Sequence, residues 1–339
     1  MLITGGCDNH CVFCGRHGLA EEARDDAAIE ADLIAARGDA DEVSFVGGEP
    51  TLERALERAI GRARALGFVA IGLQSHGRHL AAPGALAGLV DAGLTDLHLS
   101  IHGPDAAIHD HHVGVAGAHA RATEALQEAR RLGLRVVVLT VLTRSNFRHL
   151  AAMPDWLVGH GVAAWTIAAP RAAGRALLDF ERVIPRLGMA LPHALHALEV
   201  AARRRLPAWI EGAPHCLLGP YRGRDLGGAA RSFAAACEGC PARDGCPGVD
   251  PVYLARFAGD ELGPAQLRPT GAEDPRLASE AAALRRIFVG PGALATALRP
   301  LRSIVDPPRS AASRAARGVE GPDDAAGPAE AARAIESPV

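Results

Sequence analysis

Three cysteines stand close together almost at the start of the chain, in "CDNHCVFC" (residues 7–14). The spacing of Cys7, Cys11 and Cys14 is C-x3-C-x2-C. A closed structural zinc site uses four ligands, so this loop supplies one ligand too few on its own. The open alternatives are a zinc site completed from elsewhere, a disulfide with one free thiol, and a [4Fe–4S] cluster held by three thiolates.

The other four cysteines form a second group far downstream: Cys216, Cys237, Cys240 and Cys246. No signal-peptide pattern precedes Cys7, and no apolar run approaches the roughly 18 residues that span a bilayer. We therefore expect a cytoplasmic protein with no membrane partner. Thiols stay reduced there, so the cysteines indicate metal binding or catalysis rather than disulfides.

The charged residues exclude some chemistries. The net charge is −3 and all basic residues are arginine, which rules out a Schiff-base lysine and a P-loop lysine. No basic block stands out, so we expect no nucleic-acid partner.

Strands and helices are predicted to alternate along the first half of the chain. After a first strand before Cys7, apolar runs predict strands at 42–46, 68–75, 96–103, 135–143 and 162–170. Helical periodicity falls between them, at 19–37, 52–67, 81–92, 117–132 and 147–160. This alternation predicts an α/β fold, a partial (β/α)6 TIM-like barrel with a small cysteine-rich C-terminal extension. Polar segments follow each strand, at the end where such barrels carry their chemistry.

The pattern also predicts the domain organisation. We expect a barrel over residues 1–210, a cysteine-rich module over 211–265, a helical segment over 266–304 and a disordered tail over 305–339. The module is rich in Gly, Pro and Cys, as expected of a segment folded around metal, and the tail has little to bury.

The N-terminal motifs together resemble the radical S-adenosylmethionine (radical SAM) superfamily. The C-x3-C-x2-C loop follows the first strand, and "GGEP" (47–50) ends the second. The resemblance implies a [4Fe–4S] cluster on Cys7, Cys11 and Cys14 whose open iron binds SAM. It further implies cofactor contacts, at the adenine and at the methionyl amino group, from Phe13, Gly47, Gly48, Glu49 and Pro50. Glycines allow close backbone approach to a ligand, and a carboxylate accepts hydrogen bonds from an ammonium.

Later strand ends suggest further contacts to SAM. Ser100 and His102 end the fourth strand, and Thr143 and Asn146 follow the fifth. Each serves equally well as a SAM contact or as an ordinary loop cap. The family's usual "TNG" after the third strand is "QSHG" (74–77) here. "HDHH" (109–112) is either part of a substrate pocket or a solvated loop.

The downstream cysteines resemble the SPASM/twitch extensions of radical SAM enzymes. The core "CEGCPARDGC" places Cys237, Cys240 and Cys246 at C-x2-C-x5-C, and Asp250 stands where a full SPASM core has another cysteine. The resemblance implies a second [4Fe–4S] cluster, with Cys216 as fourth ligand. Zinc is the alternative for four cysteines, and His215 could replace Cys216.

The expected activity is reductive cleavage of SAM to a 5′-deoxyadenosyl radical that abstracts hydrogen from a substrate. We expect modification of a ribosomally made peptide, with oxidation or isomerisation of a small molecule as the alternative. A non-catalytic zinc-binding scaffold is the alternative from another class. The enzyme would need an electron donor such as flavodoxin or ferredoxin.

Overall fold

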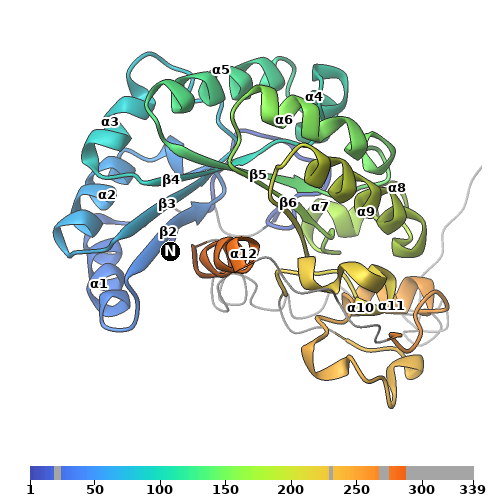
Figure 1. Ribbon diagram of the computed structural model, residues 1–339. Helices are drawn as coiled ribbons and strands as arrows, with labels where there is room; N and C mark the ends of the chain where they lie inside the picture. Colours follow the sequence, from blue (N-terminus) through green and yellow to red (C-terminus); the bar gives the residue numbers. More distant parts are fainter. Residues whose placement is uncertain (19–23, 229–231, 267–274, 288–339) are drawn as a thin grey trace, which may run out of the picture. The chain divides into compact units, whose positions relative to one another are not determined.

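The computed structural model describes residues 1–18, 24–228, 232–266 and 275–287. These residues form a seven-stranded sheet in which every strand pairs in parallel with its neighbour in sequence (Figure 1). This order is expected when each strand is followed by a crossover connection. The strands are β1 (Leu2–Thr4), β2 (Glu42–Gly47), β3 (Ala70–Ser75), β4 (Asp96–Ser100), β5 (Arg135–Val141), β6 (Ala164–Ala168) and β7 (Ala208–Glu211).

Helices return the chain between strands and line the outer face of the curved sheet (Figure 1). They are α1 (Asp26–Arg37), α2 (Ala55–Ala65), α3 (Ala85–Ala92), α4 (Ala106–Val113), α5 (Ala118–Arg131), α6 (Met153–Gly159), α7 (Gly174–Leu178), α8 (Phe180–Val183) and α9 (Leu187–Arg203). The cysteine-rich segment and the stretch after it contain α10 (His215–Leu218), α11 (Pro251–Phe257) and α12 (Pro275–Ile287). Short 3-10 helices span Pro50–Leu52, Phe147–Ala152, Gly219–Arg224, Ala235–Cys237 and Arg243–Gly245.

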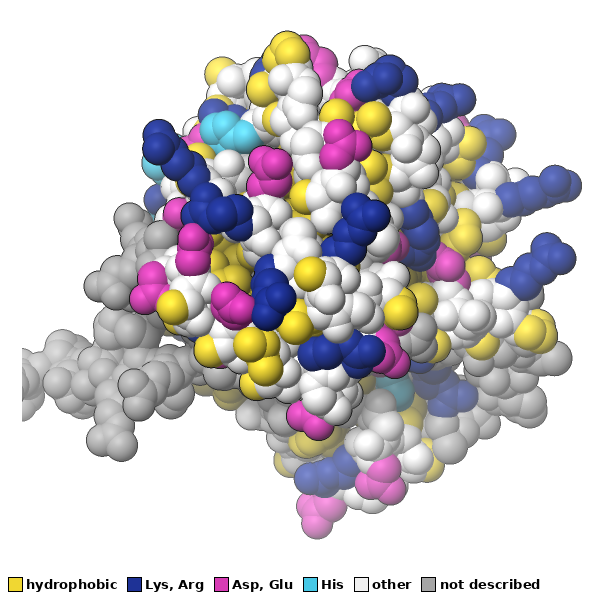
Figure 2. Space-filling model, turned by 90° about the vertical axis from the view of Figure 1, so that its left-hand side faces the viewer, with side chains coloured by type: hydrophobic (Ala, Val, Ile, Leu, Met, Phe, Trp, Pro, Cys, Tyr) yellow, Lys and Arg dark blue, Asp and Glu magenta, His cyan; other side chains and the backbone are white. Residues whose placement is uncertain are grey.

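The core lies between the sheet and this helical layer. Strand residues such as Phe45, Leu73 and Leu97 are fully buried, as is Trp165. The outer surface of the helices is charged. Arginines and acidic side chains are interspersed on the face that carries α1, α2 and α3 (Figure 2). Cross-helix ion pairs there include Arg58 with Asp26 and Arg62 with Glu30. This face is therefore a solvated one with balanced charge.

The predicted α/β fold with a partial TIM-like barrel is confirmed, with two differences. A seventh strand, β7, extends the sheet beyond the six expected βα units. Residues 106–113, expected as part of a loop, form helix α4. The first predicted helix begins only at Asp26, where Asp25 caps it by accepting the N–H of Ala28 over 2.6 Å. Residues 19–23 of that prediction lie outside the described part of the chain, as does the predicted tail.

Helix α12 packs against the sheet. Ala281 and Leu284 join a buried apolar group with Val137 of β5 and Trp209 of β7. An ion pair between Glu280 and an arginine at the start of β5 supports this contact. Within the described residues, no helix is long and apolar enough to cross a bilayer.

Candidate active site

The loop with the three cysteines begins where the ends of β1 and β2 meet. The N–H of Gly48 donates to the carbonyl of Thr4 and the N–H of Glu49 to that of Gly6, each over 2.8 Å. A Cβ at position 48 would lie 2.0 Å from the Gly6 oxygen, and one at position 47 would lie 2.2 Å from the Thr4 oxygen. The backbone of residues 4–6 therefore fills the space that a side chain at position 47 or 48 would need. This close packing holds Gly47, Gly48 and Glu49 beside the start of the cysteine loop.

Two distant segments hold the rest of this loop. The C-terminal end of α4 accepts two of its N–H groups: His10 donates to Val113 over 2.8 Å and Val12 to His112 over 2.9 Å. The start of α7 holds the far end, where the N–H of Arg175 donates to the carbonyl of Cys14 over 2.9 Å. The backbone around all three cysteines is thus fixed from outside the loop.

Asp8, next to Cys7, is a centre of charged contacts. Its carboxylate accepts hydrogen bonds from His76 over 2.9 Å, Arg78 over 2.9 Å and His79 over 3.0 Å. Burial alone raises the pKa of Asp8, but the hydrogen bond from His76 and the nearby positive charges outweigh it and hold the pKa below its ordinary value. Residues 76–79, which follow β3, therefore hold the cysteine loop in place through hydrogen bonds to Asp8.

Glu49 is only 1% exposed, and the same segment satisfies its carboxylate. Oε1 accepts the hydroxyl of Ser75 over 2.8 Å and both the N–H and hydroxyl of Thr51, over 3.1 and 2.6 Å. Oε2 accepts the N–H of His76 over 2.8 Å. A buried carboxylate with fixed donors is pre-oriented and can accept a further hydrogen bond from an ammonium.

The three thiols fit a metal cluster that binds thiolates. Burial, followed by the neighbouring Cys14 and Cys7, raises the pKa of Cys11 to about 12. Burial likewise raises the pKa of Cys7 to about 11. Thiols with raised pKa values, as at Cys7 and Cys11, stay protonated near neutral pH unless a cationic centre stabilises their thiolates. An iron–sulfur cluster does so.

The ends of β4 and β5 are joined by Asn146, which is 1% exposed. Its Nδ2 donates to the carbonyls of His102 and Val141, over 3.1 and 2.9 Å. Its Oδ1 accepts the N–H of Thr143 over 2.9 Å. Asn146 therefore holds the ends of β4 and β5 together through its side-chain hydrogen bonds. The SAM contacts expected of Thr143 and Asn146 stay predictions, as does that of Ser100, which ends β4.

A group of neutral histidines, His102, His109 and His112, lies near these two strand ends. The Nδ1 of His102 accepts the N–H of Val141 over 3.2 Å, and burial, with the charges of His109 and His112, lowers its pKa well below the ordinary value. The ring of Phe13 lies edge-on to His102, with 4.5 Å between ring centroids. The two aromatic side chains predicted to contact SAM are thus brought together.

The interpretation of "HDHH" as a solvated loop is wrong. These residues belong to α4, where His109 and His112 are buried. Burial and then His119 lower the pKa of His109 to about 3. His112 Nδ1 lies 2.6 Å from the carbonyl of Ile108 and its Nε2 lies 2.6 Å from the Thr143 hydroxyl. As neutral rings these histidines pack like apolar residues and support the cysteine loop.

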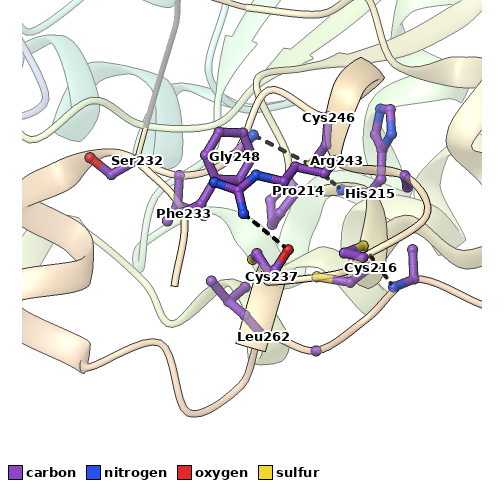
Figure 3. Close-up of a pocket in the computed structure, with 15 residues that line it drawn as sticks. Pro214, His215, Cys216, Ser232, Phe233, Cys237, Arg243, Cys246, Gly248 and Leu262 are labelled. Atoms are coloured by element: carbon purple, nitrogen blue, oxygen red, sulfur yellow. Dashed lines mark hydrogen bonds between the residues drawn. The ribbon is translucent and has the colours of Figure 1, made fainter. Parts of the chain in front are cut away.

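The four downstream cysteines line one hollow with Pro214, Phe233 and Leu262. Cys216 and Cys237 face it, whereas the His215 ring turns away (Figure 3), and its Nε2 lies 3.0 Å from Asp225. This contact uses one ring nitrogen of His215, the residue that was considered as a substitute ligand.

Backbone N–H groups point at the sulfurs in this hollow. The Sγ of Cys246 accepts from His215 and Gly248, over 3.3 and 3.4 Å, and that of Cys240 accepts from Ala265 over 3.3 Å. These contacts fix the orientation of two of the four cysteine side chains that line the hollow.

Sequence reasoning did not find three of the supporting residues. Asp8, Ser75 and Gly174 act through partners distant in the sequence, so no local pattern marks them. A Cβ at Gly174 would lie 2.3 Å from the carbonyl oxygen of Cys14. The adjacency of Asp8 to Cys7 was the one available signal.

Comparison with known proteins supports the interpretation of the N-terminal motifs. The family model of the radical SAM superfamily matches residues 1–157. A probable GTP 3′,8-cyclase from Sulfolobus acidocaldarius is 34% identical over 154 residues, which cover 43% of this chain and 47% of that protein. The PqqA peptide cyclase of Rhodopseudomonas palustris is 29% identical over 211 residues, covering 61% of this chain and 55% of that protein. The chain thus spans about half the length of these curated relatives.

Solved structures share the fold. SuiB of Streptococcus suis bound to precursor peptide SuiA matches with a TM-score of 0.54 at 16% identity, covering 64% of this chain and 49% of that one. SuiB bound to S-adenosylmethionine gives 0.54 at 15% identity, covering 70% and 53%. The expectation drawn from the C-x3-C-x2-C and GGEP motifs is confirmed for the N-terminal part of the chain: residues 1–157 form a radical SAM domain.

Proposed function

We propose that this protein is an enzyme that cleaves S-adenosylmethionine at a [4Fe–4S] cluster held by Cys7, Cys11 and Cys14, and abstracts hydrogen from its substrate. The observation that carries the proposal is the backbone pairing of the cysteine loop with the Glu49 end of β2, at 2.8 Å. This pairing sets the start of the cysteine loop, with Cys7, beside a buried carboxylate. When bound, the cluster and SAM supply an electron and a 5′-deoxyadenosyl radical.

The chain's own residues orient and shield this chemistry. Glu49, held by Ser75 and His76, accepts a hydrogen bond from the ammonium of SAM in our proposal. Phe13 offers an apolar ring to the adenine and is supported by His102. Because His102 and His109 have lowered pKa values from burial, this wall stays uncharged near neutral pH. An uncharged wall excludes water from a reactive site.

The second cysteine group is proposed to hold an auxiliary [4Fe–4S] cluster within a twitch-like module over about residues 211–265. Four thiolates fill all the iron positions of one cluster. The four cysteines that line one hollow, at a spacing that resembles a twitch core, support this proposal. Zinc would make this module a structural one.

For the substrate we propose a ribosomally made peptide. The PqqA peptide cyclase shares 29% identity over 211 residues, and the SuiB fold, solved with a precursor peptide, matches at a TM-score of 0.54. A small-molecule substrate is the second candidate, since a probable GTP 3′,8-cyclase is 34% identical over 154 residues. A reductant such as flavodoxin or ferredoxin would supply the electron.

An anaerobic assay tests the proposal. The reconstituted chain, incubated with SAM and dithionite, is expected to release 5′-deoxyadenosine. In one reaction the substrate is a pool of peptides that carry deuterium on carbon only. Deuterium should appear in the 5′-deoxyadenosine of that reaction only if peptides are substrates. A second reaction with GTP tests a small-molecule substrate. A colourless protein that contains zinc and does not cleave SAM would support a zinc-binding scaffold instead.

A further inference from the structure

Asp250 bonds to two separate parts of the chain. Its Oδ1 accepts the N–H of Val252 over 2.8 Å and caps helix α11. Its Oδ2 accepts the N–H of Ala172 over 3.2 Å. Ala172 belongs to the loop between β6 and α7, so the carboxylate joins the cysteine-rich segment to the barrel. This residue stands where a further cysteine was considered from the sequence.

The loop that Asp250 holds reaches the N-terminal cysteines directly. Three residues after Ala172, the N–H of Arg175 donates to the carbonyl of Cys14 over 2.9 Å. Gly174 has φ of +54°, and a Cβ there would lie 2.3 Å from the Cys14 oxygen and 2.9 Å from the carbonyl carbon of Gly15. Contact this tight means that a displaced 171–175 loop must also displace Cys14.

On its other side, Asp250 is fixed to the second cysteine group. It lies four residues after Cys246, whose sulfur accepts the N–H of Gly248 over 3.4 Å. The next residue, Val249, exchanges two backbone hydrogen bonds with Ser232, over 2.9 and 3.0 Å. The backbone from Cys246 to Asp250 is therefore held in place, and the position of the carboxylate depends on how Cys246 is held.

We propose that Asp250 is a positioning residue through which the downstream cysteine site orders Cys14 of the N-terminal site. The path is continuous: Cys246, Asp250, Ala172, Arg175, Cys14. A metal bound by the downstream cysteines orders Asp250, which orders the 171–175 loop and with it the last ligand of the first cluster. By thermodynamic linkage, occupancy of either site favours occupancy of the other. The metal part of this inference rests on the proposed function, whereas the Asp250–Ala172 link does not.

The test compares Asp250→Asn with Asp244→Asn, a matched change at an exposed residue of the same segment. Asparagine offers one acceptor oxygen in place of two, so it can keep the cap on Val252 or the bond to Ala172 but not both. Hydrogen exchange of the full chain is followed by mass spectrometry over residues 169–178. Loss of one hydrogen bond predicts about tenfold faster exchange there in Asp250→Asn, and none in Asp244→Asn.

Iron provides the second readout. Asp250→Asn is expected to keep the iron of the downstream site and to lose the iron of the N-terminal site faster on exposure to air. The double variant Cys237→Ala/Cys240→Ala is expected to speed exchange over residues 169–178 in the reconstituted chain. Asp250→Glu keeps a carboxylate at this position, so we expect it to show a smaller increase in exchange over residues 169–178 than Asp250→Asn.

Three outcomes would overturn the inference. Unchanged exchange over 169–178 in Asp250→Asn would show that the carboxylate only caps α11. Loss of downstream iron in Asp250→Asn would show that Asp250 is itself a metal ligand. Faster exchange in Asp250→Asn combined with no effect of Cys237→Ala/Cys240→Ala would break the link between the sites. If no iron binds at all, the proposed function fails while the exchange result still decides the role of Asp250.

Discussion

The carboxylate of Glu49, after β2, accepts the backbone N–H of His76, after β3, over 2.8 Å. The ring of His76 also contacts Asp8, with 2.9 Å between Nε2 and the carboxylate oxygen. The end of β3 thus orients both the residue proposed to bind the ammonium of SAM and the residue beside Cys7. The short segment after β3 therefore supports both Glu49 and the cysteine loop.

Replacing Glu49 by glutamine tests this arrangement. The amide nitrogen of the new side chain cannot accept a hydrogen bond, so one of the donors around Glu49 loses its partner and the ammonium loses a charged acceptor. We expect the affinity of the reconstituted protein for SAM to fall at least about tenfold, measured by anaerobic equilibrium dialysis. Glu57→Gln, at an exposed position of α2, is the control. Equal affinity in both variants would contradict the role of Glu49.

Gly48→Ala tests the close approach of β2 to the cysteine loop. The new Cβ would lie 2.0 Å from the Gly6 oxygen, which belongs to backbone and cannot rotate away. We expect a loss of about 3 kcal/mol, the upper end of the usual range for overpacking, in the free energy of unfolding, measured by urea denaturation.

The matched control for that change is Gly88→Ala in helix α3. Its Cβ would meet nothing nearer than a Glu57 carboxylate oxygen at 4.0 Å. Alanine is favoured over glycine inside a helix, so we expect stability to rise by up to about 1 kcal/mol. If Gly48→Ala were as stable as Gly88→Ala, the described packing at Gly6 would be wrong.

Much of this fold could be predicted because its repeats are regular. The runs "EVSFV" and "RVVVLTVLT" are apolar and fully paired in a parallel sheet, so their composition predicts their burial. β7 was missed because its four residues, Ala208–Glu211, follow the long helix α9 and lie beyond the regular alternation of strands and helices. α4 was missed because its buried face is made of His109 and His112, which behave as apolar residues only once burial has lowered their pKa.

The site could be predicted only in part for a related reason. The cysteines and "GGEP" carry their chemistry in adjacent residues, so they can be seen in the sequence. The partners of Asp8 lie 68 to 71 positions away, and the contact between Asp250 and Ala172 spans 78. Pairings at such separations exist only after the sheet has formed.

Stability should depend on pH through His98, which is buried in β4. Burial, and then the charge of Arg135, lowers its pKa to about 3, from an ordinary 6.5. Below pH 6.5 the unfolded chain binds a proton at this residue that the native protein does not, so stability falls as pH decreases towards 3. From pH 7 to pH 5 this amounts to about 2 kcal/mol.

The measurement is urea unfolding at both pH values. His98→Gln should lose about 2 kcal/mol less than the parent chain between pH 7 and pH 5. His196→Gln, which changes a histidine with a 56% exposed side chain, should leave the difference unaltered. An unchanged pH dependence in His98→Gln would show that the native structure does not lower the pKa of this ring.

Asn146→Ala distinguishes two roles of Asn146: joining the ends of β4 and β5, and contacting SAM. The change leaves the buried carbonyls of His102 and Val141 without their donor. Such groups cost about 1–3 kcal/mol each, so we expect a loss of several kcal/mol in the free energy of unfolding. SAM affinity at a temperature where the variant is folded should change less than threefold. A stable variant with greatly weakened SAM binding would make Asn146 a cofactor contact instead.

The most direct test of the central claim counts iron and 5′-deoxyadenosine in parallel. The anaerobically reconstituted chain and the triple variant Cys7→Ala/Cys11→Ala/Cys14→Ala are each given SAM and dithionite. We predict about eight irons per chain, falling to about four in the variant together with complete loss of 5′-deoxyadenosine. Cleavage of SAM that persists in the triple variant, or a parent chain that binds no iron and cleaves no SAM, would contradict the account.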